Sequence, residues 1–156
     1  MKIKVGVMFG GVSVEHEVSI ISAVQAMHAL NKDKYEVIPI YMAKDRTWYT
    51  GAMLTDIEVY KDFEDLKRYA KKVVLINKDG KICLESQGLF KRIVTDIDII
   101  LPVVHGNGVE DGTLAGYLET IGAPFVGPKV LGSALGQDKV VMKQIFESED
   151  IPHVKY

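Results

Sequence analysis

Two segments in which an apolar, strand-like run ends at glycines and a helical pattern follows constrain the fold more than any other feature. Ile3 to Phe9 is short, rich in β-branched residues and followed by Gly10-Gly11, which is typical of a buried strand. From about residue 16 to residue 30, apolar residues recur at helical spacing. Tyr35 to Met42 predicts a second strand, so this part of the chain predicts a right-handed β-α-β unit.

The second unit follows the same plan. Ile97 to Val104 predicts a strand, His105 to Gly112 a glycine-rich loop and Thr113 to Ile121 a helix, with Thr113 at its cap or first turn. Phe125-Val126 predicts a further brief strand. We therefore expect an α/β fold with a Rossmann-like, mainly parallel sheet and flanking helices. Ligands of such sheets lie beyond the carboxyl ends of the strands, so we expect the two glycine loops to lie close together.

The stretch between these units, residues 43–95, predicts an antiparallel insertion on the edge of the sheet. Trp48-Tyr49 predicts a short strand and Lys61 to Lys72 a charged surface helix. Asn77-Lys78-Asp79-Gly80 is a strong turn signal between two short apolar runs, so it predicts a hairpin.

The last part of the chain predicts two helices, around residues 130–135 and 139–149, and then a linker, Ile151 to Tyr156, that enters a new element. We therefore expect residues 1–128 to form one domain. Residues 129–156 are expected to be linker helices that lead into a further domain.

The composition is that of a globular protein able to form a core, since 47% of the 156 residues are hydrophobic and 26% are charged. The net charge of −2 provides no basic field for nucleic acid or a membrane surface. No apolar run approaches the length of about 18 residues that a membrane span needs, and the apolar start is too short for a signal peptide. Cys83 is the only cysteine, which excludes an internal disulfide and suits a reducing compartment, so we expect a cytoplasmic protein.

The first loop contains Gly10-Gly11, Ser13 and Glu15, and it lacks the G-x-G-x-x-G pattern of dinucleotide-binding turns. Its glycines permit a close backbone approach to a ligand. Glu15 and Glu17 have two interpretations: they complement the dipole of the following helix, or Glu15 holds a cationic group such as a substrate ammonium. His16 is expected to be a surface or capping residue rather than a catalytic base, and Ser13 a cap.

The second loop combines three glycines with His105, Glu110 and Asp111 at the end of a buried strand. One histidine with two acids is weak support for a metal site, so none is predicted. The loop is either a turn with helix-capping acids or a ligand site, and for a ligand site His105 and Glu110 are the better candidates. Further along, Asp138 is expected to cap a helix, and Lys139 has the ordinary interpretation of a solvated lysine.

Three ordered motifs resemble the D-alanine–D-alanine ligase family, and the resemblance extends along essentially the whole chain. The first two are Gly10-Gly11-x-Ser13-x-Glu15-His16-x-Val18-Ser19 and His105-Gly106-x-x-Val109-Glu110-Asp111-Gly112-Thr113. The third is Ser133-Ala134-x-x-x-Asp138-Lys139, preceded by Ala123-Pro124-Phe125-Val126-Gly127. The family has a Rossmann-like amino-terminal domain of the pre-ATP-grasp type, followed by an ATP-grasp region.

The resemblance implies an ATP-dependent ligase that joins two D-alanines through an acyl phosphate, for peptidoglycan synthesis. It implies that Glu15 binds the ammonium of the first D-alanine and that His105 lies near its carboxylate. Glu110 and Asp111 would shape the surrounding loop, and Lys139 would reach toward the ATP phosphates. The residues Gly10, Gly11, Ser13 and Gly106 would complete the substrate-binding loops.

The resemblance also implies ATP with Mg²⁺ or Mn²⁺ as cofactors of the full-length enzyme and a homodimer as its assembly. The ATP-grasp pattern and its metal ligands do not occur in these 156 residues. We therefore expect the chain to be the amino-terminal part of such a ligase, inactive alone and without tight ATP binding. The alternative is a stand-alone, non-catalytic module that binds a small molecule or a protein partner.

Three positions depart from the family pattern. Val109 stands where the signature has glycine, and if that position needs a positive φ the loop is rearranged. Ala115 replaces a usual glutamine, which removes a polar contact, and Gln137 replaces a usual methionine. A generic Rossmann nucleotide-binding domain is a weaker interpretation, because the glycine pattern it needs is missing.

Overall fold

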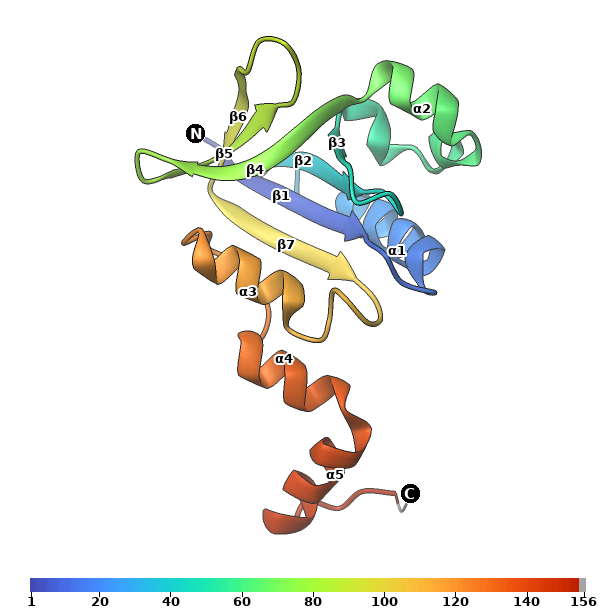
Figure 1. Ribbon diagram of the computed structural model, residues 1–156, viewed down its shortest axis with the longest axis vertical. Coiled ribbons are helices and arrows are strands. Elements are labelled where there is room, and N and C mark those ends of the chain that lie inside the picture. The colour runs from blue at the N-terminus through green and yellow to red at the C-terminus, as the bar shows by residue number, and fades with distance from the viewer. Residues whose placement is uncertain (155–156) are drawn as a thin grey trace.

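The computed structural model describes residues 1–154 and places seven strands in one sheet, in the order β6-β5-β4-β3-β2-β1-β7. The strand β1 (Ile3–Gly10) pairs in parallel with β2 (Tyr35–Met42) on one side and with the edge strand β7 (Ile99–Val104) on the other. This is the predicted Rossmann-like core. Figure 1 shows the three strands running side by side, with the carboxyl ends of β1 and β7 at the same edge.

The antiparallel insertion adds the other four strands to this core. They are β3 (Trp48–Thr50), β4 (Lys71–Lys78), β5 (Lys81–Ser86) and β6 (Ile93–Ile97). All their pairings, from β2·β3 to β5·β6, are antiparallel. The predicted α/β class and edge insertion are confirmed, but the sheet is mixed rather than mainly parallel, because the insertion contributes four antiparallel strand pairs against the two parallel pairs of the core.

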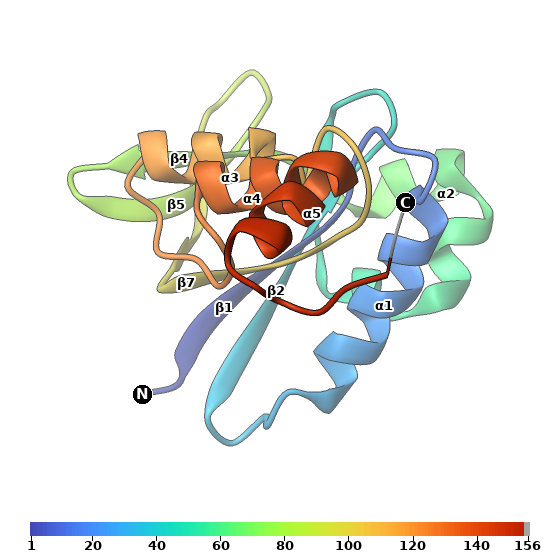
Figure 2. The same cartoon turned by 90° about the horizontal axis from the view of Figure 1, so that it is seen from below.

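Two predicted helices cover opposite faces of the sheet: α1 (His16–Ala29) and α3 (Thr113–Thr120). Successive residues of β1 point to opposite faces, as a strand requires. Val7 therefore belongs to the apolar cluster under α1, whereas Met8 belongs to the cluster that includes Leu118 of α3. Figure 2 shows α1 and α3 on either side of the sheet.

The helix predicted over Lys61 to Lys72 is shorter than expected. Two 3₁₀ helices, Ala52–Thr55 and Ile57–Lys61, precede α2 (Phe63–Tyr69). Asp62 caps α2 by accepting a hydrogen bond from the Asp65 N–H. The helix ends where it does because the next residues pair with β3 as the first part of β4.

The strand predicted over Ile97 to Val104 is confirmed as β7, which begins two residues later, because Ile97 ends β6 and the two strands meet at Asp98. β6 and β7 are the two edge strands of the sheet. Because they are consecutive in the chain, the sheet is curved and their junction at Asp98 lies against the start of β1. The Asp98 N–H donates to the Lys4 carbonyl at 2.9 Å, and the Lys4 N–H donates to the Asp98 carboxylate at 2.7 Å. The Lys4 ammonium also pairs with Asp96.

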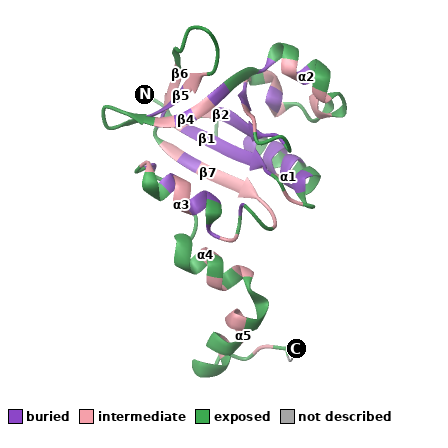
Figure 3. Ribbon diagram, in the orientation of Figure 1, coloured by how far each residue is buried: buried purple, intermediate pink, exposed green. Residues whose placement is uncertain are grey.

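The last two helices, α4 (Val130–Gln137) and α5 (Lys139–Ser148), form an arm that extends away from the sheet. Neither contains a buried residue, and Figure 3 shows the contrast with the buried strands. Residues 151–154 have no regular structure, and the end of the predicted linker, residues 155–156, lies outside the described residues. Across residues 1–154, no helix is both long and apolar enough to cross a membrane.

Candidate functional site

The two glycine loops lie against each other beyond β1 and β7, as the sequence predicted. The Ser13 hydroxyl donates a hydrogen bond to the His105 carbonyl at 2.7 Å and accepts one from the Glu15 N–H at 3.1 Å. A Cβ built on Gly106 would lie 3.1 Å from Oε2 of Glu15. Ser13 thus joins the two loops, and the Glu15 carboxylate lies over the backbone of the second loop.

Glu15 presents its carboxylate without a partner among residues 1–154. It occupies the N-cap position of α1 but makes no side-chain capping bond there. No hydrogen bond or ion pair neutralises it in the described part of the chain. Glu17 differs, because its carboxylate accepts a 2.5 Å hydrogen bond from Lys44, which lowers the pKa of Glu17. Of these two acids at the start of α1, Glu15 is therefore the one free to bind a cation.

His105 lies at the other side of the same surface and is partly buried. Its Nε2 is 3.3 Å from the Ser22 hydroxyl of α1, and its Nδ1 is 4.0 Å from Oε1 of Glu110. The other carboxylate oxygen of Glu110 accepts a 2.6 Å hydrogen bond from the Gly106 N–H. Glu110 therefore contacts both the ring of His105 and the backbone beside it.

Asp111 fixes the rest of the second loop. Its carboxylate accepts hydrogen bonds from the Gly108 N–H at 2.7 Å and the Thr113 N–H at 3.0 Å. Hydrogen bonding from the Thr113 side chain and from these backbone groups lowers the pKa of Asp111. Thr113 is the first residue of α3 rather than its cap, since the N-cap is Gly112. The side chain that accepts a hydrogen bond at the start of α3 is Asp111, which lies one residue before the N-cap Gly112.

Val109, the departure from the family signature, is a buried residue of the core cluster under α3. The positive φ values of this loop fall on its three glycines, Gly106, Gly108 and Gly112, and not on Val109, so the valine is not strained in the way its position suggested. A Cβ on Gly11 would lie 2.7 Å from Cγ1 of Val109. The valine therefore packs directly against the first loop, and glycine at position 11 makes room for it.

His16 is not the surface or capping residue that the sequence suggested. It is buried, with 3% of its surface exposed, and both ring nitrogens are bonded, to the Gly11 carbonyl at 2.6 Å and the Tyr41 hydroxyl at 3.0 Å. Ser19 is also buried and links the Gly10 N–H to the Val103 carbonyl. A signal for both was present, since they share the helical stripe of the buried residues Ile20, Ala23, Val24 and Met27.

The start of α5 is connected to the second loop through the end of α4. The Gln137 amide donates a 3.1 Å hydrogen bond to the Asn107 side chain. Asp138 caps α5, as predicted, by accepting bonds from the N–H groups of Val140 and Val141. Lys139 follows directly as the exposed first residue of α5.

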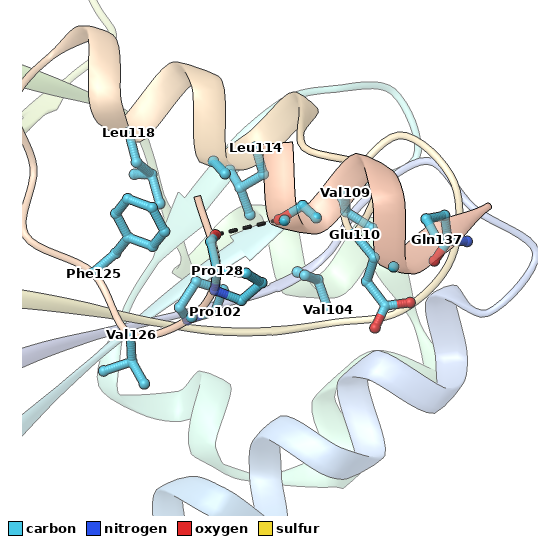
Figure 4. Close-up of a pocket in the computed structure, with 15 residues that line it drawn as sticks. Pro102, Val104, Val109, Glu110, Leu114, Leu118, Phe125, Val126, Pro128 and Gln137 are labelled. Atoms are coloured by element: carbon cyan, nitrogen blue, oxygen red, sulfur yellow. Dashed lines mark hydrogen bonds between the residues drawn. The ribbon is translucent and has the colours of Figure 1, made fainter. Parts of the chain in front are cut away.

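A cavity of about 330 Å³ lies between β7, α3 and α4, next to this surface. Figure 4 shows Glu110 towards one end of it and Phe125 at the other. Ala115 is also among the residues that line it. Two further cavities, of about 190 and 560 Å³, lie beside Trp48 and between α1 and α2. Neither Glu15 nor His105 lines any of these three cavities; the Glu15 side chain is exposed and that of His105 is partly buried. Within residues 1–154, no group of three or more metal-binding side chains is placed to hold a metal ion.

Comparison with known proteins gives one consistent result. Residues 4–128 match the family described as the D-ala D-ala ligase N-terminus. The chain is 40% identical over 154 residues to the D-alanine–D-alanine ligase of Thermosipho melanesiensis, covering 99% of this chain and 42% of that protein.

Solved structures agree with the sequence comparison. The D-alanine–D-alanine ligase of Coxiella burnetii superposes with a TM-score of 0.81 at 31% identity, covering 99% of this chain and 43% of that one. The VanG D-Ala:D-Ser ligase of Enterococcus faecalis gives 0.78 at 30% identity, covering 99% and 44%. The chain thus spans less than half the length of these relatives. It belongs to the D-alanine–D-alanine ligase family and corresponds to the amino-terminal part of its members.

Proposed function

We propose that this chain supplies part of the binding site for the first D-alanine in an ATP-dependent D-alanine–D-alanine ligase that makes the dipeptide for peptidoglycan synthesis. The observation that carries the proposal is the unpaired Glu15 carboxylate held over Gly106 beside His105. A carboxylate with no protein partner attracts a ligand ammonium, and a histidine nearby can donate to the ligand carboxylate. An amino acid carries both groups.

In this proposal Glu15 binds the ammonium of the first D-alanine and His105 contacts its carboxylate. Gly10, Gly11 and Gly106 allow the backbone to approach the substrate, and Ser13 holds the loops together. Glu110 and Asp111 act on the loop, because their carboxylates accept its backbone N–H groups. The bonds that these acids make support a shaping role rather than direct chemistry.

ATP and magnesium enter this proposal through the family alone. Residues 1–154 provide no set of oxygen ligands for a divalent cation, so we assign no metal ligand to this chain. Lys139, exposed at the start of α5, is proposed to reach the ATP phosphates. We also propose that residues 1–128 are the substrate domain, that residues 129–156 lead into the nucleotide-binding region, and that the enzyme is a cytoplasmic homodimer.

The test is an ADP-release assay on the product of the complete reading frame that encodes this sequence. The assay supplies ATP and magnesium with D-alanine, with L-alanine, or with D-alanine paired with D-serine or D-lactate. We expect ADP release that depends on D-alanine, with a dipeptide detected by mass spectrometry. D-alanine binding without any ADP release would support the stand-alone module instead, and release that ignores stereochemistry would contradict the proposal.

A further inference from the structure

We propose that His16 is a positioning residue that holds the Gly11 carbonyl and thereby places Glu15 for the substrate ammonium. This inference rests on the proposed function of Glu15. His16 does not face the open two-loop surface, since its ring is buried beneath the first loop.

The bonds of the His16 ring define one arrangement of protons. The Gly11 carbonyl can only accept, so Nδ1 must carry the hydrogen in the 2.6 Å contact. In the neutral ring Nε2 is then an acceptor, and the Tyr41 hydroxyl, 3.0 Å away, donates to it. Burial raises the pKa of Tyr41 to about 12, so the hydroxyl keeps its proton at neutral pH. Both partners of His16 are thereby satisfied.

The position of the Tyr41 hydroxyl is fixed by the packing of its ring. It extends from β2, is 5% exposed, and its ring meets the His16 ring edge-on at a centroid distance of 5.6 Å. Four other aromatic rings lie within 6.4 Å of the Tyr41 ring, namely Phe9, Tyr49, Tyr60 and Phe63. A side chain packed on so many rings holds its hydroxyl in one place.

The hydrogen bond between His16 and Gly11 joins the two ends of the short segment that contains Glu15. Gly11 is fixed on both sides, because its N–H donates to the Met42 carbonyl at 2.7 Å and its carbonyl accepts from His16. Glu15 lies directly before His16, and its carbonyl accepts from the Ser19 N–H in the first turn of α1. A shift of the Glu15 backbone relative to β1 would therefore strain the bond between His16 and Gly11.

Two substitutions separate this role from simple packing. In His16→Asn the side-chain amide takes the place of Nδ1, so the donor to the Gly11 carbonyl is kept. In His16→Gln the amide takes the place of Nε2, so the contact with Tyr41 is kept and the contact with Gly11 is lost. Both variants remove the imidazole ring, so a loss common to both reports packing and only their difference reports the Gly11 bond.

The experiment measures kcat and the KM for the first D-alanine in the complete protein, with thermal unfolding recorded for each variant. We expect His16→Gln to raise this KM by on the order of tenfold with little change in kcat, because a displaced binding group weakens binding. We expect His16→Asn to stay within about threefold of the wild type. Equal KM values in the two variants, or a fall in kcat at an unchanged KM, would overturn the proposal.

Two further readouts cover the cases in which the kinetics cannot decide. If neither His16 variant folds, Tyr41→Phe removes only the hydroxyl and keeps the bond to Gly11, so we expect its KM to stay within about threefold of the wild type, and a tenfold rise would overturn the proposal. If the wild type releases no ADP, the proposed function fails by itself. Hydrogen exchange of residues 10–19 then tests the loop, with faster exchange expected in His16→Gln than in His16→Asn and equal rates contradicting the role.

Discussion

Replacing Gly11 with alanine should damage this fold more than its small size suggests. Gly11 has a φ of 92°, a region that L-residues disfavour, and its added Cβ would lie 2.7 Å from Cγ1 of Val109. Because real Cβ contacts are longer than this, the valine or the loop must move. Val109 is buried and β-branched, so it has little freedom to rotate away.

A matched control isolates the steric part of this cost. Gly80 in the β4–β5 turn has a similar φ of 81°, but a Cβ there would meet nothing within 4 Å. Gly80→Ala therefore carries only the conformational cost, about 1–2 kcal/mol. Gly11→Ala adds the cost of overpacking, so it should be the more destabilising by roughly 1–3 kcal/mol.

Denaturant unfolding of the single and double variants measures these differences directly. Val109→Ala alone should cost roughly 2 kcal/mol, because it removes two buried methyl groups. In the double variant the clash is gone, so Gly11→Ala and Val109→Ala together should cost less than their sum by about 1 kcal/mol or more. Additive costs, or a Gly11→Ala cost no greater than that of Gly80→Ala, would refute the close contact between the two loops.

Three further predictions follow from other contacts. Ser19→Ala should cost about 1–3 kcal/mol in unfolding free energy, because it leaves the Gly10 N–H and the Val103 carbonyl without their buried partner. The exposed control Ser148→Ala should stay within about 0.5 kcal/mol, and equal losses would contradict this. Hydrogen bonding lowers the pKa of Asp111, so the stability that Asp111 contributes is present above its unfolded pKa of about 4 and is lost as the pH falls through the lower folded pKa. The stability difference between wild type and Asp111→Asn, followed by denaturation against pH, should therefore shrink below about pH 4, and a constant difference would contradict it. The 156-residue chain alone should show no micromolar ATP binding by isothermal titration, and a clear micromolar isotherm would contradict that.

The first β-α-β unit was predictable from the sequence because its signals are local. Helical spacing defined α1 and glycines ended β1, and both elements match the structure closely. The break at Asp98 was not predictable, since a single acid within a mostly apolar run does not reveal that β6 and β7 pair with different strands. The shortened α2 has a similar cause, because pairing with β3 drew Lys71 and Lys72 into β4.

The site was predictable as a place but not as a set of contacts. Glycines at two strand ends correctly indicated that the loops would meet, and Ser13 joins them. The burial of His16 was missed because a polar residue beside acids at a helix start is usually exposed. Its partner Tyr41 lies 25 residues away on another strand, and no local pattern links the two. The partners of Val109 were equally hidden, since they depend on how two loops fit together.

The most direct test of Glu15 compares two neighbouring acids in the complete protein. Glu15→Gln removes the unpaired carboxylate, whereas Glu17→Gln removes one that is exposed and paired with Lys44. Steady-state ADP release gives the KM for the first D-alanine in each variant. Loss of the ammonium–carboxylate contact predicts a KM raised on the order of 10- to 100-fold for Glu15→Gln. The exposed pair predicts a change within about twofold for Glu17→Gln. Equal KM values for Glu15→Gln and the wild type would contradict the proposed substrate site.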